Sequence, residues 1–154
     1  MAKRQLSPGE AAKLPPGQVL TDKWPVLTYG PTPRCDPDTW DFRIFGEVNA
    51  PQQLTLTQFR DLPTVTVRTD FHCVTRWSRF DNTWDGVPTK VLWDMADPTH
   101  AARHVLIHAE GGYTANLTRE DFLAPKSLFA WRHDGTDLTP DHGWPLRLVV
   151  PHLY

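Results

Sequence analysis

The chain has 154 residues, a formal net charge of −2 and 40% hydrophobic residues, enough for one ordinary domain with its own core. The nearly neutral charge and the lack of a basic run argue against nucleic acid or an anionic membrane surface as the main partner. No run of about 18 apolar residues is present, so we expect no membrane insertion.

The cysteine content and the first residues bear on the compartment. Two cysteines, Cys35 and Cys73, do not make a disulfide framework. The first ten residues contain two basic side chains but no apolar stretch after them, so no secretory signal is expected. The cytoplasm, where both thiols stay reduced, is therefore the expected location.

Residues 1–22 are expected to form a flexible N-terminal tail, because Pro8-Gly9 and Pro15-Pro16-Gly17 interrupt any periodic pattern. The folded domain is expected over 23–154. Its first segment, 24–33, is too rich in proline for a helix and too aromatic for a linker, so we expect an extended arm laid on the domain.

Hydrophobic periodicity predicts the elements that follow. Apolar and polar residues alternate over 39–48, with Trp40, Phe42 and Ile44 on one face, and again over 64–71, so both segments are expected strands. The second strand delivers His72 and Cys73 at its carboxyl end. Helices are expected over 56–62, from Pro88 to a point before Pro98, and over 118–123, and further strands over 103–109, 113–117, 127–132 and 146–150.

Gly111-Gly112 and Asp134-Gly135 are expected turns between strands. Fifteen prolines disfavour long helices, and seven tryptophans indicate an irregular core or a site for a planar ligand. The expected class is α+β, dominated by a mixed sheet with short helices.

Cys73 stands in the segment Phe71-His72-Cys73-Val74-Thr75-Arg76-Trp77-Ser78, which Trp84-Asp85-Gly86-Val87-Pro88 follows. A free cysteine is usually a small buried hydrophobe, and we keep that interpretation for Cys35. Around Cys73, however, His72, Arg68, Arg76 and Arg79 supply positive charge that favours thiolate, the form that binds soft metals.

This segment resembles the molybdenum-binding segment of the sulfite oxidase and methionine sulfoxide reductase (MsrP) group of molybdopterin oxidoreductases. From about Trp24 to Tyr154 the order of elements is similar to their molybdopterin-binding fold. The resemblance implies a molybdenum–molybdopterin cofactor, with Cys73 as the catalytic metal ligand and with Arg76 and Trp77 among the residues that bind the cofactor. The arginines after Cys73 fall at other offsets than in animal and plant sulfite oxidases, which argues against sulfite as the substrate.

Three further segments are similar to the family's cofactor site. His142-Gly143-Trp144-Pro145-Leu146-Arg147 resembles the segment whose histidine and arginine hold the pterin, so His142 and Arg147 inherit that role. Without the resemblance, Arg147 would be read as an exposed edge-strand residue. Leu27, Thr28 and Tyr29 lie where the family's arm meets the pterin, although an arm that only covers a sheet edge is an equal alternative. Tyr113 corresponds to a tyrosine near the metal, or is simply a strand aromatic.

The resemblance implies oxygen-atom transfer on a small-molecule substrate, with electrons exchanged through a separate redox partner protein or electron carrier. No haem attachment motif is present, and two cysteines are too few for an iron–sulfur cluster. A Cys73–His142 nucleophile pair is a further alternative. Related chains continue beyond the position of Tyr154, so we expect either a C-terminally truncated chain or a natural short form. The alternative function is a non-catalytic scaffold or binding domain without a complete cofactor site.

Overall fold

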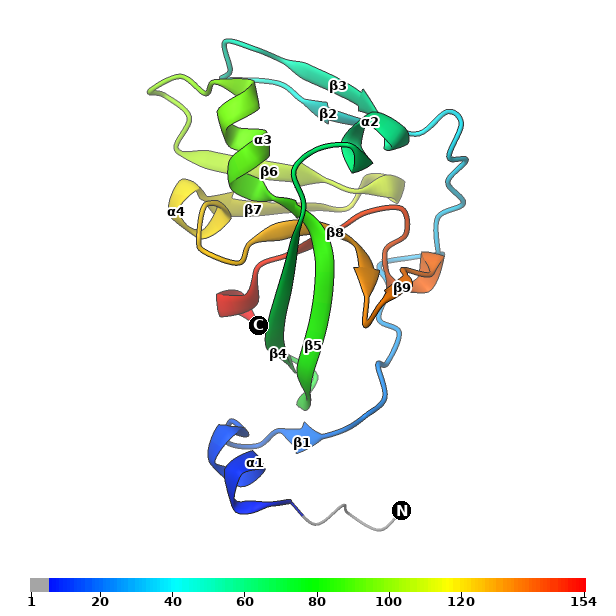
Figure 1. Cartoon of the computed structure of the whole chain (residues 1–154), viewed down its shortest axis with the longest axis vertical. Helices are drawn as coiled ribbons and strands as arrows, with labels where there is room; N and C mark the ends of the chain where they lie inside the picture. Colours follow the sequence, from blue (N-terminus) through cyan, green and yellow to red (C-terminus); the bar gives the residue numbers. More distant parts are fainter. Residues whose placement is uncertain (1–5) are drawn as a thin grey trace.

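The computed structural model describes residues 6–154, and Figure 1 shows their course. The elements in chain order are α1 (Pro8–Lys13), β1 (Val19–Leu20), β2 (Asp41–Ile44), β3 (Gln52–Thr55), α2 (Leu56–Arg60), β4 (Val65–Cys73), β5 (Trp77–Pro88), α3 (Thr89–Ala96), β6 (His104–His108), η1 (Glu110–Gly112), β7 (Thr114–Thr118), α4 (Arg119–Phe122), β8 (Leu128–His133), β9 (Thr136–Asp137), η2 (Pro140–His142), β10 (Arg147–Val149) and η3 (Pro151–Leu153). Short helices among many strands confirm the predicted α+β class.

In this part of the chain the main sheet has six strands, and β5 is its central member. β4 and β8 pair antiparallel with β5, and β10 pairs with the other edge of β8. β1 adds to the start of β5 in parallel. In Figure 1 the long β4–β5 hairpin runs from the end that carries α3 to the end that carries α1 and β1.

Gly86 allows β5 and β8 to approach each other closely. A Cβ atom at this position would lie 2.1 Å from the carbonyl oxygen of Phe129 and 2.7 Å from the Cα of Ala130. The strand register also shifts between Asp85 and Gly86. A residue without a side chain is therefore required where the two backbones meet.

Two core clusters lie within the fold. The first core cluster contains Val67, Phe71, Trp84, Leu128, Ala130, Leu138 and Val149, with Trp24, Cys73, Trp77, Trp144 and Tyr154 packed against it. The second core cluster contains Phe59, Val87, Leu92, Phe122 and Phe129. Helices α2, α3 and α4 each contribute one side chain to the second cluster, so the helices cover this side of the sheet.

Local signals in the sequence are confirmed at several elements. Thr55 and Thr118 cap α2 and α4 by accepting hydrogen bonds from backbone N–H groups. The hairpin β6–β7 turns at Gly111-Gly112, and β8–β9 turns at Asp134-Gly135, where both residues have positive φ. By contrast, β3 and the twelve-residue β5 were not predicted.

The N-terminal segment differs from the expected tail. Residues 1–5 lie outside the described residues, but α1 begins with a capping box in which Ser7 and Glu10 bond each other's backbone. β1 then pairs with Trp77 and Ser78. The prolines and glycines that suggested a tail terminate these short elements instead, because Pro at the first turn of a helix is tolerated. The domain boundary at residue 22 stays a prediction. Among the described residues, no helix has both the length and the apolar character that crossing a membrane requires.

Candidate functional site

Cys73 is the last residue of β4, as predicted, and lies directly opposite Trp77 across the hairpin. Three residues, Val74, Thr75 and Arg76, make the connection, and the N–H of Arg76 donates to the Cys73 carbonyl at 2.9 Å. Arg76 has a φ of 69°, the left-handed residue that three-residue hairpin loops require. The Cys73 Sγ lies 3.1 Å from Thr75 Oγ1. A half-buried thiol is thus presented at a tight turn.

The positive charges expected around the thiol are largely engaged elsewhere. Arg68 pairs with Asp81 at 3.0 Å, and Arg79 pairs with Asp134 at 2.6 Å. His72 contacts Ser78 Oγ through Nδ1 at 2.8 Å. Neighbours in sequence along a strand point to alternate faces, so these side chains find partners across the sheet, and their role at the thiol stays a prediction.

His142 and Arg147, which the sequence paired, meet around Trp24. The Arg147 guanidinium carbon lies 5.2 Å from the Trp24 ring centroid, and Nη1 donates to the His142 carbonyl at 3.2 Å. The His142 ring stacks on Trp24 with centroids 3.9 Å apart. Arg147 is half-buried, so it is not an exposed residue of the edge strand. Trp24 is the link between the two predicted residues.

Both ring nitrogens of His142 have partners. Nε2 donates to the carbonyl of Trp24 at 3.2 Å, because that oxygen can only accept. Nδ1 lies 3.1 Å from the Thr139 hydroxyl. Cys73, whose sulfur contacts Thr75, forms no hydrogen bond with His142, so the alternative of a cysteine–histidine nucleophile pair is not supported by the geometry.

His133 forms a second contact to the same arm. Its ring packs against both Trp24 and Trp84, with centroids 4.3 Å and 4.5 Å away, and the two tryptophan rings also contact each other at 5.4 Å. Burial lowers the pKa of His133 to about 4. The negative charge of Asp134 raises this pKa, and the positive charge of Arg79 lowers it further. His133 Nε2 also lies 2.9 Å from Asn82 Oδ1, so a neutral imidazole sits within a polar network.

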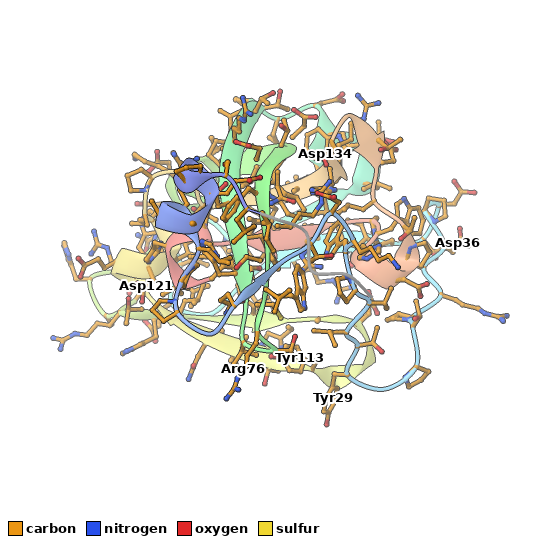
Figure 2. All side chains as sticks on the ribbon, turned by 90° about the horizontal axis from the view of Figure 1, so that it is seen from below. Tyr29, Asp36, Arg76, Tyr113, Asp121 and Asp134 are labelled. Carbon is orange, nitrogen blue, oxygen red and sulfur yellow. The ribbon has the colours of Figure 1, made fainter. Side chains whose placement is uncertain are left out.

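Trp77 is half-buried against the first core cluster, whereas the other remaining predicted residues are exposed. Leu27 and Tyr29 are 58% and 76% exposed, and Thr28 and Arg76 are exposed as well. Tyr113 is 48% exposed, and its ring lies 5.4 Å from that of Tyr29, so the arm and the β6–β7 hairpin meet here. In the view of Figure 2, Tyr29, Arg76 and Tyr113 lie toward one side of the molecule and Asp134 toward the other.

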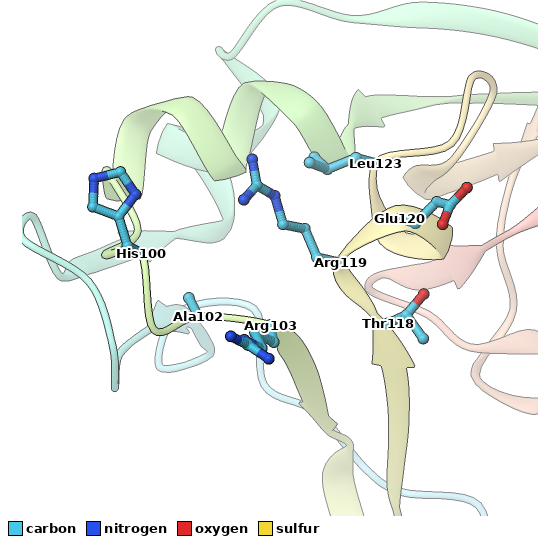
Figure 3. A pocket seen from close by; sticks show the side chains of 7 residues that line it. All are labelled: His100, Ala102, Arg103, Thr118, Arg119, Glu120 and Leu123. Carbon is cyan, nitrogen blue, oxygen red and sulfur yellow. The ribbon is translucent and has the colours of Figure 1, made fainter.

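A separate open hollow of about 520 Å³ lies between the loop before β6 and helix α4. Figure 3 shows its lining residues, His100, Ala102, Arg103, Thr118, Arg119, Glu120 and Leu123, with the Arg119 side chain extending across it. None of the predicted site residues lines this hollow. Within residues 6–154, no three His, Cys, Asp or Glu side chains gather as a metal site. The candidate site is therefore the surface of the first core cluster.

Sequence reasoning missed three residues of this surface. Trp24 was assigned to the arm, but its stacking on His142 was not foreseen, although its aromatic character was a signal. His133 carried no signal beyond its place before the Asp134-Gly135 turn. Gln18 lay in the expected tail, yet its amide donates to the Cys73 carbonyl at 3.0 Å.

Comparison with known proteins identifies the family. The model of the oxidoreductase molybdopterin-binding domain matches residues 29–154. An uncharacterized oxidoreductase, YuiH of Bacillus subtilis (strain 168), is 42% identical over 146 residues, which cover 94% of this chain and 74% of that protein. The catalytic subunit of the protein-methionine-sulfoxide reductase MsrP of Gluconobacter oxydans (strain 621H) is 30% identical, over 82% of this chain and 44% of that protein.

A solved structure agrees in fold. The sulfane dehydrogenase SoxCD of Paracoccus pantotrophus superposes with a TM-score of 0.69 at 18% identity, over 77% of this chain and 35% of that chain. This chain thus spans less than half of MsrP and of the superposed chain. It belongs to the oxidoreductase molybdopterin-binding domain family, which confirms the predicted sulfite oxidase-like fold and the predicted molybdenum–molybdopterin cofactor.

Proposed function

We propose that this chain is an oxidoreductase domain that transfers an oxygen atom to or from a small substrate, with Cys73 as the molybdenum ligand. The position of Cys73 carries the proposal. The thiol lies at the carboxyl end of β4, and it packs against the same cluster over which the Arg147 guanidinium lies, 5.8 Å from the Phe71 ring. A thiolate is a soft ligand suited to such a metal.

Unpartnered donors around this cluster fit a cofactor rich in hydrogen-bond acceptors. The indole N–H groups of Trp77 and Trp84 are buried without an acceptor among residues 6–154. In the same part of the chain, Arg147 forms no ion pair, and its guanidinium donates only to the His142 carbonyl. Buried donors without acceptors are rare, so these groups favour an additional partner. A pterin with its phosphate offers both acceptors and negative charge.

When bound, the cofactor supplies the two-electron chemistry, and the protein supplies its binding and orientation. Arg147 would hold the anionic or polar end of the pterin by charge-assisted hydrogen bonds. The backbone carbonyl of His142 accepts a hydrogen bond from Arg147 and so orients the guanidinium. The His142 ring stacks on Trp24 and so positions the arm. A direct contact from this imidazole to the pterin requires one of its two present partners, Thr139 or Trp24, to be released.

The exposed side chains at the rim fit a substrate entrance. Tyr113 and Tyr29 contact each other from separate segments, and we assign Leu27, Thr28 and Tyr29 to the cofactor side of the arm and Tyr113 to the substrate side. Arg76, exposed on the turn after Cys73, is assigned to the same rim. Electrons pass to a separate carrier, because these 154 residues contain only two cysteines and no haem attachment motif. The cytoplasm remains the predicted compartment.

The test is metal content in matched cysteine variants. The protein, Cys73→Ser and Cys35→Ser are purified from cells supplied with molybdate, and molybdenum per chain is measured by mass spectrometry. Cys35 is a suitable control because it is also a half-buried free thiol. We expect molybdenum in the unchanged protein and in Cys35→Ser, and its loss in Cys73→Ser.

If Cys73→Ser and Cys35→Ser contain the same amount of molybdenum per chain, Cys73 is not the molybdenum ligand. Absence of molybdenum from all three proteins would instead favour the scaffold or binding domain. Oxygen transfer is then assayed on the metal-loaded protein with an artificial electron dye. Turnover without any added donor or acceptor would contradict the separate carrier.

A further inference from the structure

Residues 18–21, which precede the region that the family model matches, lie against the turn that carries Cys73. The Gln18 side-chain Nε2 donates to the Cys73 carbonyl at 3.0 Å. The backbone N–H of Val19 donates to the Arg76 carbonyl at 3.0 Å, and that of Thr21 donates to the Ser78 carbonyl at 2.9 Å. The segment therefore contacts the turn at its beginning and at its end.

The Gln18 amide joins both strands of the hairpin. Its Oε1 accepts from the hydroxyl of Ser78 on β5 at 3.3 Å, while its Nε2 reaches Cys73 on β4. Ser78 is fully buried, and its oxygen lies 2.8 Å from His72 Nδ1. Because the single hydroxyl proton goes to Gln18, His72 Nδ1 must be the donor in that contact. One chain of hydrogen bonds thus runs from His72 through Ser78 and Gln18 to Cys73.

The turn needs support from outside. Arg76 occupies a left-handed position with a φ of 69°, where a side chain is strained. Val74 is 93% exposed and packs against nothing that would fix the loop. The local sequence Val74-Thr75-Arg76 has no glycine for the left-handed position, so the turn's own contacts, from Arg76 N–H and Thr75 Oγ1 to Cys73, must hold a strained residue.

We propose that Gln18 is a positioning residue that holds the Cys73 turn in the conformation in which the thiol meets the cofactor. The proposal rests on the proposed function of Cys73. Residues 18–21 therefore contribute to the cofactor site, although they precede the residues that the family model matches. Gln18 acts through the Cys73 carbonyl and does not touch the metal itself.

The experiment compares Gln18→Ala and Gln18→Glu with the control Gln53→Ala. Gln53 is an exposed glutamine on β3 whose amide donates to Asp41. Amide hydrogen exchange is measured for peptides that cover 73–78 and, as a reference, the β6–β7 hairpin. We expect exchange at 73–78 to rise about five- to tenfold in Gln18→Ala, as loss of these hydrogen bonds predicts, with the reference hairpin unchanged.

Gln18→Glu separates hydrogen bonding from simple packing. Glutamate keeps the size of the side chain and the acceptor for Ser78, but it places a second oxygen against the Cys73 carbonyl. We expect faster exchange at 73–78 and faster loss of molybdenum on dialysis in both Gln18 variants, with neither change in Gln53→Ala. Unchanged exchange in Gln18→Ala, normal behaviour of Gln18→Glu, or faster exchange throughout the chain in both would overturn the proposal.

The exchange measurement is independent of the metal. If the unchanged protein contains no molybdenum, the proposed function fails, whereas the exchange at 73–78 still reports whether Gln18 fixes the turn. If molybdenum is present but is lost at the same rate in all variants, the positioning role fails and the function of Cys73 stands.

Discussion

The two core clusters differ in how completely their polar groups are satisfied. In the second core cluster, helices cover the aromatic and aliphatic side chains, and the buried hydroxyl of Thr89 donates to the carbonyl oxygens of Phe122 and Ser127. In the first core cluster, the indole N–H groups of Trp77 and Trp84 lack acceptors within residues 6–154, and Arg147 lies over the aromatic rings.

This difference indicates which side of the sheet carries the binding site. Beside the second core cluster, Arg60 Nε is the one side-chain atom within residues 6–154 that is buried without an acceptor, and the same guanidinium pairs with Asp137, so this cluster contributes mainly stability. A cluster that leaves donors and a cation on an aromatic surface has unused binding capacity. The same sheet therefore separates a structural side, under the helices, from a binding side, under the arm and Arg147.

The largest expected effect is on the structural side. Phe59 is fully buried in the second core cluster, so Phe59→Ala is expected to lower the free energy of unfolding by about 3–5 kcal/mol. The measurement is urea unfolding at a temperature where the variant stays folded. Cofactor content per folded chain should not change. A loss below about 1 kcal/mol would show that the second cluster does not carry the stability assigned to it.

A pH dependence is expected from His133. Its pKa is about 4 in the folded protein against an ordinary value of 6.5, so the unfolded chain binds more protons between these values. Stability should be full above pH 6.5 and fall as the pH approaches 4, by up to about 3 kcal/mol. In His133→Gln this part of the dependence should disappear. An equally steep loss in the variant over this pH range would assign the titration to another group.

Arg147→Ala tests the binding side. Charge-assisted hydrogen bonds are worth about 1.5–3 kcal/mol each, so cofactor affinity should fall roughly tenfold or more. Arg147→Lys should restore little, because an ammonium cannot reproduce the planar fork. Pterin content and the unfolding midpoint are measured for both variants. Unchanged pterin content in Arg147→Ala would remove this residue from the site.

The smallest effect is expected on the exposed face of α3. Lys90 and Asp94 form an exposed ion pair at 2.7 Å, four residues apart. Lys90→Ala should change the free energy of unfolding by no more than about 0.5 kcal/mol, since solvent screens such pairs. Cofactor content should stay the same, which makes this variant the reference for Arg147→Ala. A change in metal content in Lys90→Ala would contradict the assignment of the structural side and the binding side to separate parts of the sheet.

Several elements and the end position of Cys73 were predictable from sequence. The alternation over 64–71 identified β4, and the capping threonines and glycine turns identified α2, α4 and the hairpins, because these signals act within a few residues. The twelve-residue β5 was not recognised. Its turn contains no glycine, two of its buried positions are the polar residues Ser78 and Asn82, and the register shift between Asp85 and Gly86 breaks the alternation.

Periodicity, capping and motif spacing are local properties, and they were enough to predict the fold class, the family and the place of the thiol at a strand end. The three-dimensional structure was needed to show that Gln18 reaches Cys73, that His133 packs against two tryptophans, and that Arg147 lies over Trp24. These contacts join residues about fifty or more positions apart. Such contacts depend on how strands pair and how the chain returns to the sheet, which no local pattern specifies.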